Sequence, residues 1–407
     1  MKLRRFTNRD RRKLDSDDDR VRECVRLLLS MESGLNRRWD EETFRDGQRN
    51  GKLKSIVISA TKEIEAIDLF CGAGGLSYGL RRTGIKVVAG FDLDPACEYP
   101  FRENNEAKFI RADIANVKGA DLDALYSPTS IRLLAGCAPC QPFSTYRQGA
   151  PNPTDKRWNL LSEFGRLVRE SSPDIITMEN VPLLEKQDIF CRFVDTLESL
   201  GYKTSFRVVN CADYGVPQFR RRLVMLASRF ADISLISPTH KSHLTVRKAI
   251  EGLPSLEAGQ VDASDPLHQA ASLSPTNLKR IRSSRPGGTW RDWDSQLVAD
   301  CHKKETGQTY PSVYARMSWD EPSPTMTTQF YGFGNGRFGH PNQDRAISLR
   351  EGAILQSFPK RYRFVPIDQP IHRKIIGRLI GNAVPVKLGE AIGRSIREHI
   401  ANGAENR

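Results

Sequence analysis

The residue whose type and setting best suit it to catalysis or ligand binding is Cys140, in the segment Gly136–Ser144. Cys140 stands between Pro139 and Pro142, and the segment directly follows the apolar run 131–135. An apolar run that ends at a glycine predicts a buried strand leading into a loop. Prolines fix the backbone and remove N–H donors, so we expect Cys140 to be held at the end of a strand and not packed in a core. A cysteine held in this way can act as a nucleophile, a metal ligand or one half of a redox pair.

The spacing of Cys137 and Cys140 also fits a redox pair or half of a zinc site. A zinc site would need a second pair of ligands, and the sequence contains no second C-x-x-C pair, so we predict no metal. A thioredoxin-like redox site would not need the other segments of the chain that contain glycine turns, carboxylates and arginines. The nucleophile interpretation therefore depends on those segments.

The first of them is a glycine turn at residues 68–75, directly after an apolar strand. In an open α/β sheet such a turn lets the backbone approach a ligand beyond the carboxyl ends of the strands. It is not the dinucleotide fingerprint, because Ser77 stands where a third glycine would fall. Asp92 and Asp94 follow the next strand, at about the distance where an acidic residue meets ribose hydroxyls.

The order and spacing of these segments resemble the cytosine-5 DNA methyltransferases of prokaryotic restriction-modification systems. The resemblance covers roughly residues 63 to 400. Each motif alone is weak, but six in family order are very unusual by chance. The segments that carry the resemblance are Ala66–Ser77, Gly136–Ser144, Met178–Pro182, Gln218–Arg222, Arg350–Pro359 and Gly381–Pro385.

This resemblance implies transfer of a methyl group from S-adenosylmethionine to carbon 5 of cytosine, with Cys140 as the nucleophile. Carbon 5 is barely nucleophilic, and attack of a thiolate at carbon 6 makes it enamine-like. Free cysteine, with a pKa of about 8.5, is mostly protonated near neutrality, so we expect Arg220 and Arg222 to favour the thiolate. Glu179 would contact ring nitrogen 3 and the exocyclic amine. The base that removes the carbon 5 proton stays unassigned.

The resemblance also implies where S-adenosylmethionine binds. Phe70 and the glycines would line its methionine part, Asp92 would bind the ribose and Asp113 the adenine amino group. The family usually has glutamate, then often a bulky residue, where this chain has Asp92 and Leu93. Asn382 would close the pocket from a C-terminal helix. The predicted cofactor contacts are Asp68, Phe70, Gly72, Gly74, Gly75, Leu76, Asp92, Leu93, Asp113, Ile114, Pro139, Asn382 and Val384.

Apolar runs and helical patterns alternate between about residues 63 and 235. This alternation predicts an α/β fold with a parallel sheet covered by helices on both faces, a doubly wound, Rossmann-like methyltransferase domain. We predict strands at 64–70, 87–91, 132–135, 175–178 and 223–227, and helices at 160–170, 190–200 and 391–400.

Changes in composition divide the chain into four parts. We predict a charged helical extension at 1–60, the catalytic domain at 61–235, a smaller loop-rich target-recognition domain at 236–345, and a segment at 346–407 that returns to the catalytic domain. The net charge of +13 favours a polyanionic partner. The resemblance makes that partner duplex DNA, from which the target base must be flipped. The predicted DNA contacts are Gln218, Lys279, Arg282, Arg285, Arg316 and Thr325.

No apolar run approaches the length of a membrane span, and the first residues lack the apolar region of a signal peptide. The eight cysteines have no regular spacing, which favours reduced thiols. We therefore expect a cytoplasmic monomer, either solitary or paired with a cognate restriction or phage-defence system. Two alternatives stay open: an RNA cytosine-5 methyltransferase, and a catalytically idle DNA-binding regulator. The presence of Cys140, Glu179 and Arg222 argues against the second.

Overall fold

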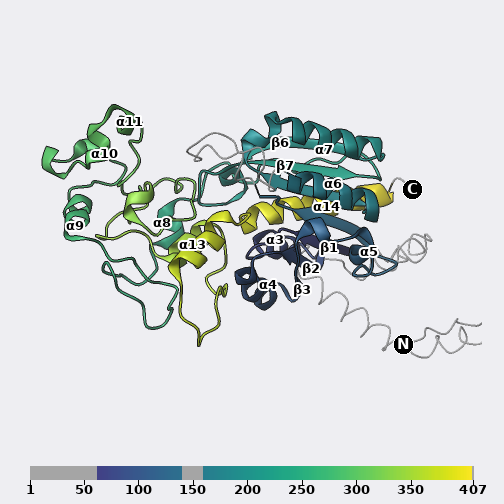
Figure 1. The fold of residues 1–407 in the computed structure, drawn as a ribbon, viewed down its shortest axis with the longest axis horizontal. Coiled ribbons are helices and arrows are strands. Elements are labelled where there is room, and N and C mark those ends of the chain that lie inside the picture. The colour runs from purple at the N-terminus through teal and green to yellow at the C-terminus, as the bar shows by residue number, and fades with distance from the viewer. Residues whose placement is uncertain (1–61, 140–158, 406–407) are drawn as a thin grey trace, which may run out of the picture. The chain divides into compact units, whose positions relative to one another are not determined.

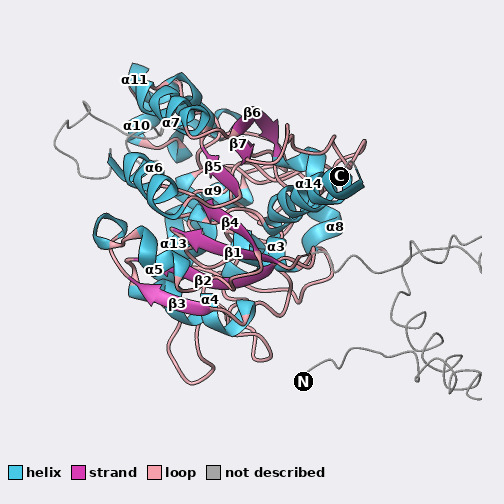
Figure 2. Cartoon of the chain, turned by 90° about the vertical axis from the view of Figure 1, so that its right-hand side faces the viewer, coloured by secondary structure: helices cyan, strands magenta, loops and turns pink. Residues whose placement is uncertain are grey.

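The computed structural model describes residues 62–139 and 159–405 of the 407-residue chain. The predicted extension at 1–60 and Cys140 itself lie outside these residues. A seven-stranded sheet organises the described part (Figures 1 and 2). Its strands are β1 (Ile64–Leu69), β2 (Lys86–Asp92), β3 (Lys108–Arg111), β4 (Ile131–Gly136), β5 (Ile175–Asn180), β6 (Lys203–Asn210) and β7 (Arg221–Ser228).

Helices cover the sheet and build the region that follows it. In chain order they are α3 (Gly75–Arg81), α4 (Glu98–Asn105), α5 (Gly119–Asp123), α6 (Leu160–Ser171), α7 (Asp188–Ser199), α8 (Val246–Ile250), α9 (Pro275–Arg282), α10 (Asp300–Lys303), α11 (Glu305–Gln308), α12 (Leu349–Leu355), α13 (Arg373–Asn382) and α14 (Val386–Glu405). None of the described helices is both long and apolar enough to cross a membrane.

The strand order is β3-β2-β1-β4-β5-β7-β6, and β1 pairs in parallel with both β2 and β4. The chain first winds outward from β1 to β3 and then returns to continue on the other side with β4 and β5. In an open α/β sheet the point where the winding reverses leaves a crevice beyond the carboxyl ends of the strands. The loops that follow β1 and β4 therefore leave the sheet side by side at this switch point.

At one edge the sheet departs from the predicted parallel arrangement. Strand β7 lies between β5 and β6 and runs antiparallel to both. The physical reason is the length of the connection, because residues 211–220 link β6 to β7. A parallel neighbour needs a crossover of a dozen or more residues, whereas an antiparallel one can follow a short connection. The five predicted strands are confirmed, with ends that differ by a few residues.

Two apolar cores confirm that helices cover both faces of the sheet. Successive residues of a strand point to opposite faces, and in β1 Ala66 belongs to one core whereas Ile67 belongs to the other. The first core includes side chains from α3 and α14, and the second includes side chains from α5, α6 and α7 (Figure 2). The predicted doubly wound architecture is therefore the observed one.

Helix α14 returns from the end of the chain to pack against α3 (Figure 1). The two segments approach closely because Gly75 and Gly79 have no side chain. A Cβ atom added to Gly75 would lie 2.2 Å from the carbonyl oxygen of Val384, and one added to Gly79 would lie 2.5 Å from that of Val386. This contact places the C-terminal helix against the first helix of the sheet region.

Beyond the sheet, residues of 236–345 contribute to two further cores. One gathers Val246, Met317 and Met326 with C-terminal side chains such as Leu355 and Ile380. The other is smaller and contains Ile281, Trp290, Trp293, Phe333 and Ala346. The loop-rich region is therefore tied to the C-terminal segment by shared apolar packing, while α9 and its neighbours form a small core of their own.

Candidate active site

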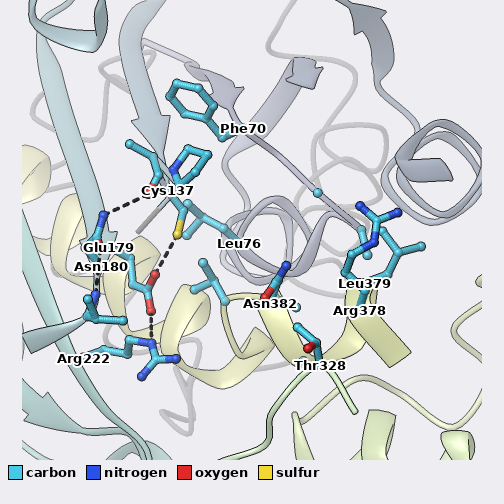
Figure 3. Close-up of a pocket in the computed structure, with 18 of the residues that line it drawn as sticks. Phe70, Leu76, Cys137, Glu179, Asn180, Arg222, Thr328, Arg378, Leu379 and Asn382 are labelled. Carbon is cyan, nitrogen blue, oxygen red and sulfur yellow. Dashed lines mark hydrogen bonds and ion pairs between the residues drawn. The ribbon is translucent and has the colours of Figure 1, made fainter. Parts of the chain in front are cut away.

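A cavity of about 1490 Å³ opens at the carboxyl ends of β1, β2, β4 and β5. Its wall includes the glycine turn after β1, the loop after β2, the end of β4 and the Glu179 region of β5. The opposite side is closed by residues 325–329 and by the turn between α13 and α14 (Figure 3). The cavity thus joins most of the predicted cofactor residues to Glu179, Arg220 and Arg222.

The end of β4 is fixed by its neighbour β5. Gly136 pairs with Met178, so the next residues of each strand, Cys137 and Glu179, lie beside each other. The Asn180 side-chain amide donates to the carbonyl oxygen of Ala138 at 3.0 Å. Pro139 lines the cavity and is the last described residue before Cys140. Asn180 therefore anchors the backbone two residues before the predicted nucleophile.

Glu179 is 2% exposed and is contacted by two side chains from neighbouring strands (Figure 3). The thiol of Cys137 donates to Oε2 at 2.9 Å. The Nε of Arg222 lies 2.9 Å from Oε1 in an ion pair. This pair is not aligned as a hydrogen bond, and among the described residues Oε1 has no hydrogen-bond partner. A buried carboxylate oxygen without a hydrogen-bond partner can still accept a hydrogen bond from a ligand.

Arg220 is placed differently from Arg222. It is 2% exposed, and its guanidinium donates to the carbonyl oxygens of Met326 and Gly381 at 3.1 Å. Burial is the main cause that lowers the pKa of Arg220, to about 10. Arg220 lines the cavity but ties the sheet to the α13–α14 turn, so its main contacts are structural.

Gln218 does not face DNA as predicted. It is fully buried, its Nε2 donates to Gln356 at 3.0 Å, and its Oε1 accepts from the backbone of Met326 at 2.8 Å. Arg316 is also withdrawn from the surface, because its guanidinium donates to the backbone carbonyls of Ile281 and His340 and is 5% exposed. Long polar side chains need partners when they are buried, and here the partners are protein groups. The structure therefore corrects both DNA-contact predictions to structural roles.

The glycine turn is braced by Asp92. One carboxylate oxygen of Asp92 accepts from the backbone of Gly72 at 2.9 Å, and the other accepts from the backbone of Asp94 at the same distance. Burial is the main cause that raises the pKa of Asp92 above its usual value. Each oxygen keeps a further lone pair, so bracing the turn and contacting a ribose hydroxyl are compatible.

Asp68 lies near the end of β1, just before this turn. The hydroxyl of Ser77 donates to its Oδ2 at 2.6 Å. Burial raises the pKa of Asp68 to about 7, because the ionised form loses its hydration and the neighbouring Asp92 repels it. Asp68 lines the cavity, and a cationic ligand there would favour its charged form.

Two apolar side chains in this half of the cavity are exposed enough to contact a ligand. Phe70 has a φ of 58°, in the left-handed region that costs a non-glycine residue about 1–3 kcal/mol. Leu93, after β2, is 60% exposed. Exposed Asp113 caps the next turn by accepting from Ala115, and buried Ile114 follows it in the cavity wall. Apolar surfaces next to carboxylates at strand ends suit a nucleoside with a cationic tail.

The α13–α14 turn closes this half of the cavity. Asn382 and Val384 line it, as predicted for the closing segment, and Leu76 lies opposite them on α3 (Figure 3). Gly74 adopts a φ of +84°, and a Cβ atom there would lie 2.2 Å from the side chain of Asn105. Glycine is therefore required at this position by both conformation and space.

Three predicted DNA contacts remain at the surface of the loop-rich region. Lys279 and Arg282 are exposed on α9, and Arg285 follows in a loop. Arg282 and Arg285 form ion pairs with Asp344 and Asp292, but their side chains stay 63% and 73% exposed. Thr325 lies apart from these cations, in the cavity wall, where its hydroxyl donates to the carbonyl of Phe219 at 2.7 Å. The structure thus brings Thr325 to the candidate active site and leaves the cations elsewhere.

A family model described as C-5 cytosine-specific DNA methylase matches residues 64–398. The chain belongs to this family. The methylase is 50% identical over 339 residues to the Type II methylase M.HgiDII of Herpetosiphon aurantiacus, covering 82% of this chain and 95% of that protein. It is 33% identical to the Type II methyltransferase M.Eco47II of Escherichia coli, over 81% of this chain and 78% of that one.

Solved structures agree on the fold of the methylase. A DNA modification methyltransferase encoded within an E. coli prophage matches with a TM-score of 0.64 and 22% identity, over 83% of this chain and 99% of that one. The Dnmt2 methyltransferase of S. pombe matches with a TM-score of 0.57 and 18% identity, over 83% and 99%. At these identities the comparison concerns the fold alone. The methylase is thus a cytosine-5 DNA methyltransferase by family and shares its fold with methyltransferases.

The sequence did not single out several residues that shape this site. Cys137 was considered only as part of a C-x-x-C pair, although it contacts Glu179. Asn180 belonged to a motif but was given no role. Arg378 of α13 forms an ion pair with Asp94 across the cavity, 284 positions further along the chain. Strand pairing could have indicated the first two, whereas no local signal indicates the third.

Proposed function

We propose that the methylase transfers a methyl group from S-adenosylmethionine to carbon 5 of a cytosine flipped out of duplex DNA, through a covalent adduct with Cys140. One observation carries this proposal: the glycine turn and the Glu179–Arg222 pair line the same cavity. A methyl donor and a flipped base could therefore meet in one cavity. A base must leave the stack to reach such a cavity, at a cost of a few kcal/mol.

In the proposed reaction the thiolate of Cys140 forms a bond to carbon 6, and the carbon 5–carbon 6 π electrons shift toward carbon 5. Carbon 5 then takes the methyl group, after which a base removes the carbon 5 proton. The electron pair of that C–H bond re-forms the double bond, and the sulfur leaves as thiolate. This covalent route replaces one difficult step by two easier ones.

Glu179 would act on the base while sulfur adds. Its buried carboxylate can accept from the exocyclic amine of cytosine, and in its protonated form it can donate to ring nitrogen 3. A partner at nitrogen 3 stabilises the charge that develops in the ring. Arg222 is positioned by its ion pair to balance the charge of the carboxylate and to favour the thiolate form of a nearby cysteine. These assignments follow the roles predicted from the motifs.

The residues present fit S-adenosylmethionine, which would supply an electrophilic methyl group on a sulfonium. Phe70 and the glycine turn would hold its methionine part, Asp92 its ribose, and Asp113 and Leu93 its adenine. Asp68 would lie on the side of the cationic groups. Asn382 and Val384 would close the site from the C-terminal segment, which already packs against α3.

We assign DNA binding to the exposed cations Lys279, Arg282 and Arg285. They would contact phosphates and contribute to affinity without recognising the base sequence. Because the relatives include Type II methylases, the DNA site is proposed to be the target of a restriction-modification system.

The test is transfer of labelled methyl from S-adenosylmethionine to mixed-sequence duplex DNA by the wild type and by Cys140→Ser. We expect label on carbon 5 of cytosine with the wild type alone, and sequencing of the modified DNA then gives the target site. A second DNA should carry 5-fluorocytosine at that site. Fluorine on carbon 5 cannot be removed as a proton is, so the wild type should stay covalently attached. Label on RNA, or equal transfer by Cys140→Ser, would contradict the proposal.

A further inference from the structure

The contact between Cys137 and Glu179 has no role in the reaction described above. Cys137 ends the β4 segment three residues before Cys140, and its thiol donates to Glu179 Oε2 at 2.9 Å. The two side chains meet because Gly136 pairs with Met178 in the parallel β4–β5 ladder. The same loop therefore supplies the proposed nucleophile and a donor to the proposed base-binding carboxylate.

We propose that Cys137 is a positioning residue that fixes the carboxylate of Glu179 toward the flipped cytosine. This inference rests on the proposed function, because it acts through the contact of Glu179 with the base. Cys137 does not touch the reacting atoms in this proposal. It holds Oε2 from one side while Arg222 holds Oε1 from the other.

A carboxylate held at one oxygen alone can still rotate about its last side-chain bond, because this torsion has a broad energy profile. The pair of anchors removes that freedom, since the thiol comes from the end of β4 and the guanidinium from β7 (Figure 3). The plane of the carboxylate is thereby set before the base arrives. A preorganised group does not have to reorient during the reaction, so the barrier of the step that it assists is lower.

The contact also links the two halves of the catalytic site. The Asn180 amide already anchors Ala138, one residue after Cys137, to the end of β5. With the Cys137–Glu179 bond, consecutive residues of β5 grip consecutive residues of the loop that leads to Cys140. A displacement of residues 137 and 138 would therefore move the carboxylate as well, which couples the end of β4 to the residue proposed to bind the base.

The simpler interpretation is that Cys137 only fills space, because it packs partly against the core beneath the sheet. Substitutions can separate the two roles. Serine keeps a donor, whereas valine removes the donor and fills the site with an apolar side chain that is larger than cysteine by about one methyl group. Cys137→Val should slow methyl transfer about tenfold, which corresponds to about 1.4 kcal/mol. Cys137→Ser should recover most of that loss.

The deciding experiment is a double-mutant cycle with the full-length chain, measured as single-turnover methyl transfer to DNA that contains the target site. The four proteins are wild type, Cys137→Val, Glu179→Gln and the double variant. If Cys137 acts through Glu179, the tenfold effect should shrink to within about twofold in the Glu179→Gln background, because neighbours that share one interaction are not additive. Affinity for DNA and for S-adenosylmethionine should change less than threefold in Cys137→Val.

Three results would overturn the inference: an equal loss in both backgrounds, an equal loss for the serine and valine variants, or wild-type rates in Cys137→Val. If Cys137→Val does not fold, as judged by its thermal midpoint, Cys137→Ala replaces it in the same cycle. A wild type that transfers no methyl to DNA would instead remove the proposed function. The failure of this inference and the failure of the function are therefore distinguishable.

Discussion

Burial of Asp68 predicts that part of the stability of the methylase falls as pH rises. Its side chain is 2% exposed at the end of β1. Burial is the largest cause that raises its pKa from 3.8 to about 7, and the bond from Ser77 offsets this only in part. The perturbation is Asp68→Asn, which keeps the shape of the side chain and an oxygen to accept the Ser77 hydroxyl.

The sign follows from where the proton is bound. Below pH 3.8 the carboxyl group is protonated in both states, and it contributes no pH dependence. Between pH 3.8 and about 7 it is ionised in the unfolded chain but protonated in the folded one. The unfolded state then binds fewer protons, so the free energy of unfolding falls with rising pH. Each pH unit is worth about 1.4 kcal/mol, so the full interval is worth about 4 kcal/mol.

The assay is denaturant unfolding of the wild type and Asp68→Asn at pH 5, 6, 7 and 8. The stability of the variant relative to wild type should rise by about 3 kcal/mol between pH 5 and 7 and then level off. Asp113→Asn removes an exposed carboxylate from the same sheet edge and serves as the matched control. S-adenosylmethionine, if its cation binds near Asp68, should move this dependence to lower pH. A pH-independent difference between wild type and Asp68→Asn would refute the reasoning.

Three further substitutions test the packing and the DNA surface. Gly75→Ala should lower the free energy of unfolding by about 1–3 kcal/mol or more, because its Cβ atom would lie 2.2 Å from the carbonyl oxygen of Val384. Gly252→Ala, whose Cβ atom would meet nothing within 4 Å, is the control in the same unfolding assay. Arg282→Ala should reduce the slope of log affinity for DNA against log salt by about 0.9, measured by titration, and an unchanged slope would exclude a phosphate contact. Arg220→Met should destabilise the fold by about 2–3 kcal/mol, since it leaves buried carbonyls unpaired, whereas Arg221→Met at an exposed site should change stability by less than about 0.5 kcal/mol in thermal unfolding.

The central strands were predictable from the sequence because both of their faces are buried. β1, β4 and β5 are buried along almost their whole length and carry apolar residues on both faces, which is the pattern expected of a sheet covered by helices. The edge strands lack this pattern. β6 has mostly exposed or half-buried residues, and β3 has only four residues, so neither has the apolar signal of the central strands.

The clustering of the glycine turn with the strand-end carboxylates was also predictable, because groups that follow successive parallel strands must meet at one edge of a sheet. The sequence did not predict the hydrogen bonds that these groups form with one another. Asp92 was predicted to bind a ribose, and it also holds the turn at Gly72. Its distance from Gly72 in the sequence gives no hint of this bond, which depends on the register of β1 against β2.

The arginines beside β7 show why composition could not separate the catalytic groups from the structural ones. Arg220 and Arg222 stand two positions apart in one basic run, and both were predicted to favour the thiolate of the nucleophile. Pairing of β5 with β7 brings a carboxylate to Arg222. Arg220 meets instead the carbonyls of residues 326 and 381, which lie 106 and 161 positions away. A carbonyl carries no full charge, so Arg220 keeps its charge at the cost of burial, and its pKa falls to about 10. Sequence patterning therefore locates the cations, but the distant oxygen that each one meets decides whether it remains available to a substrate.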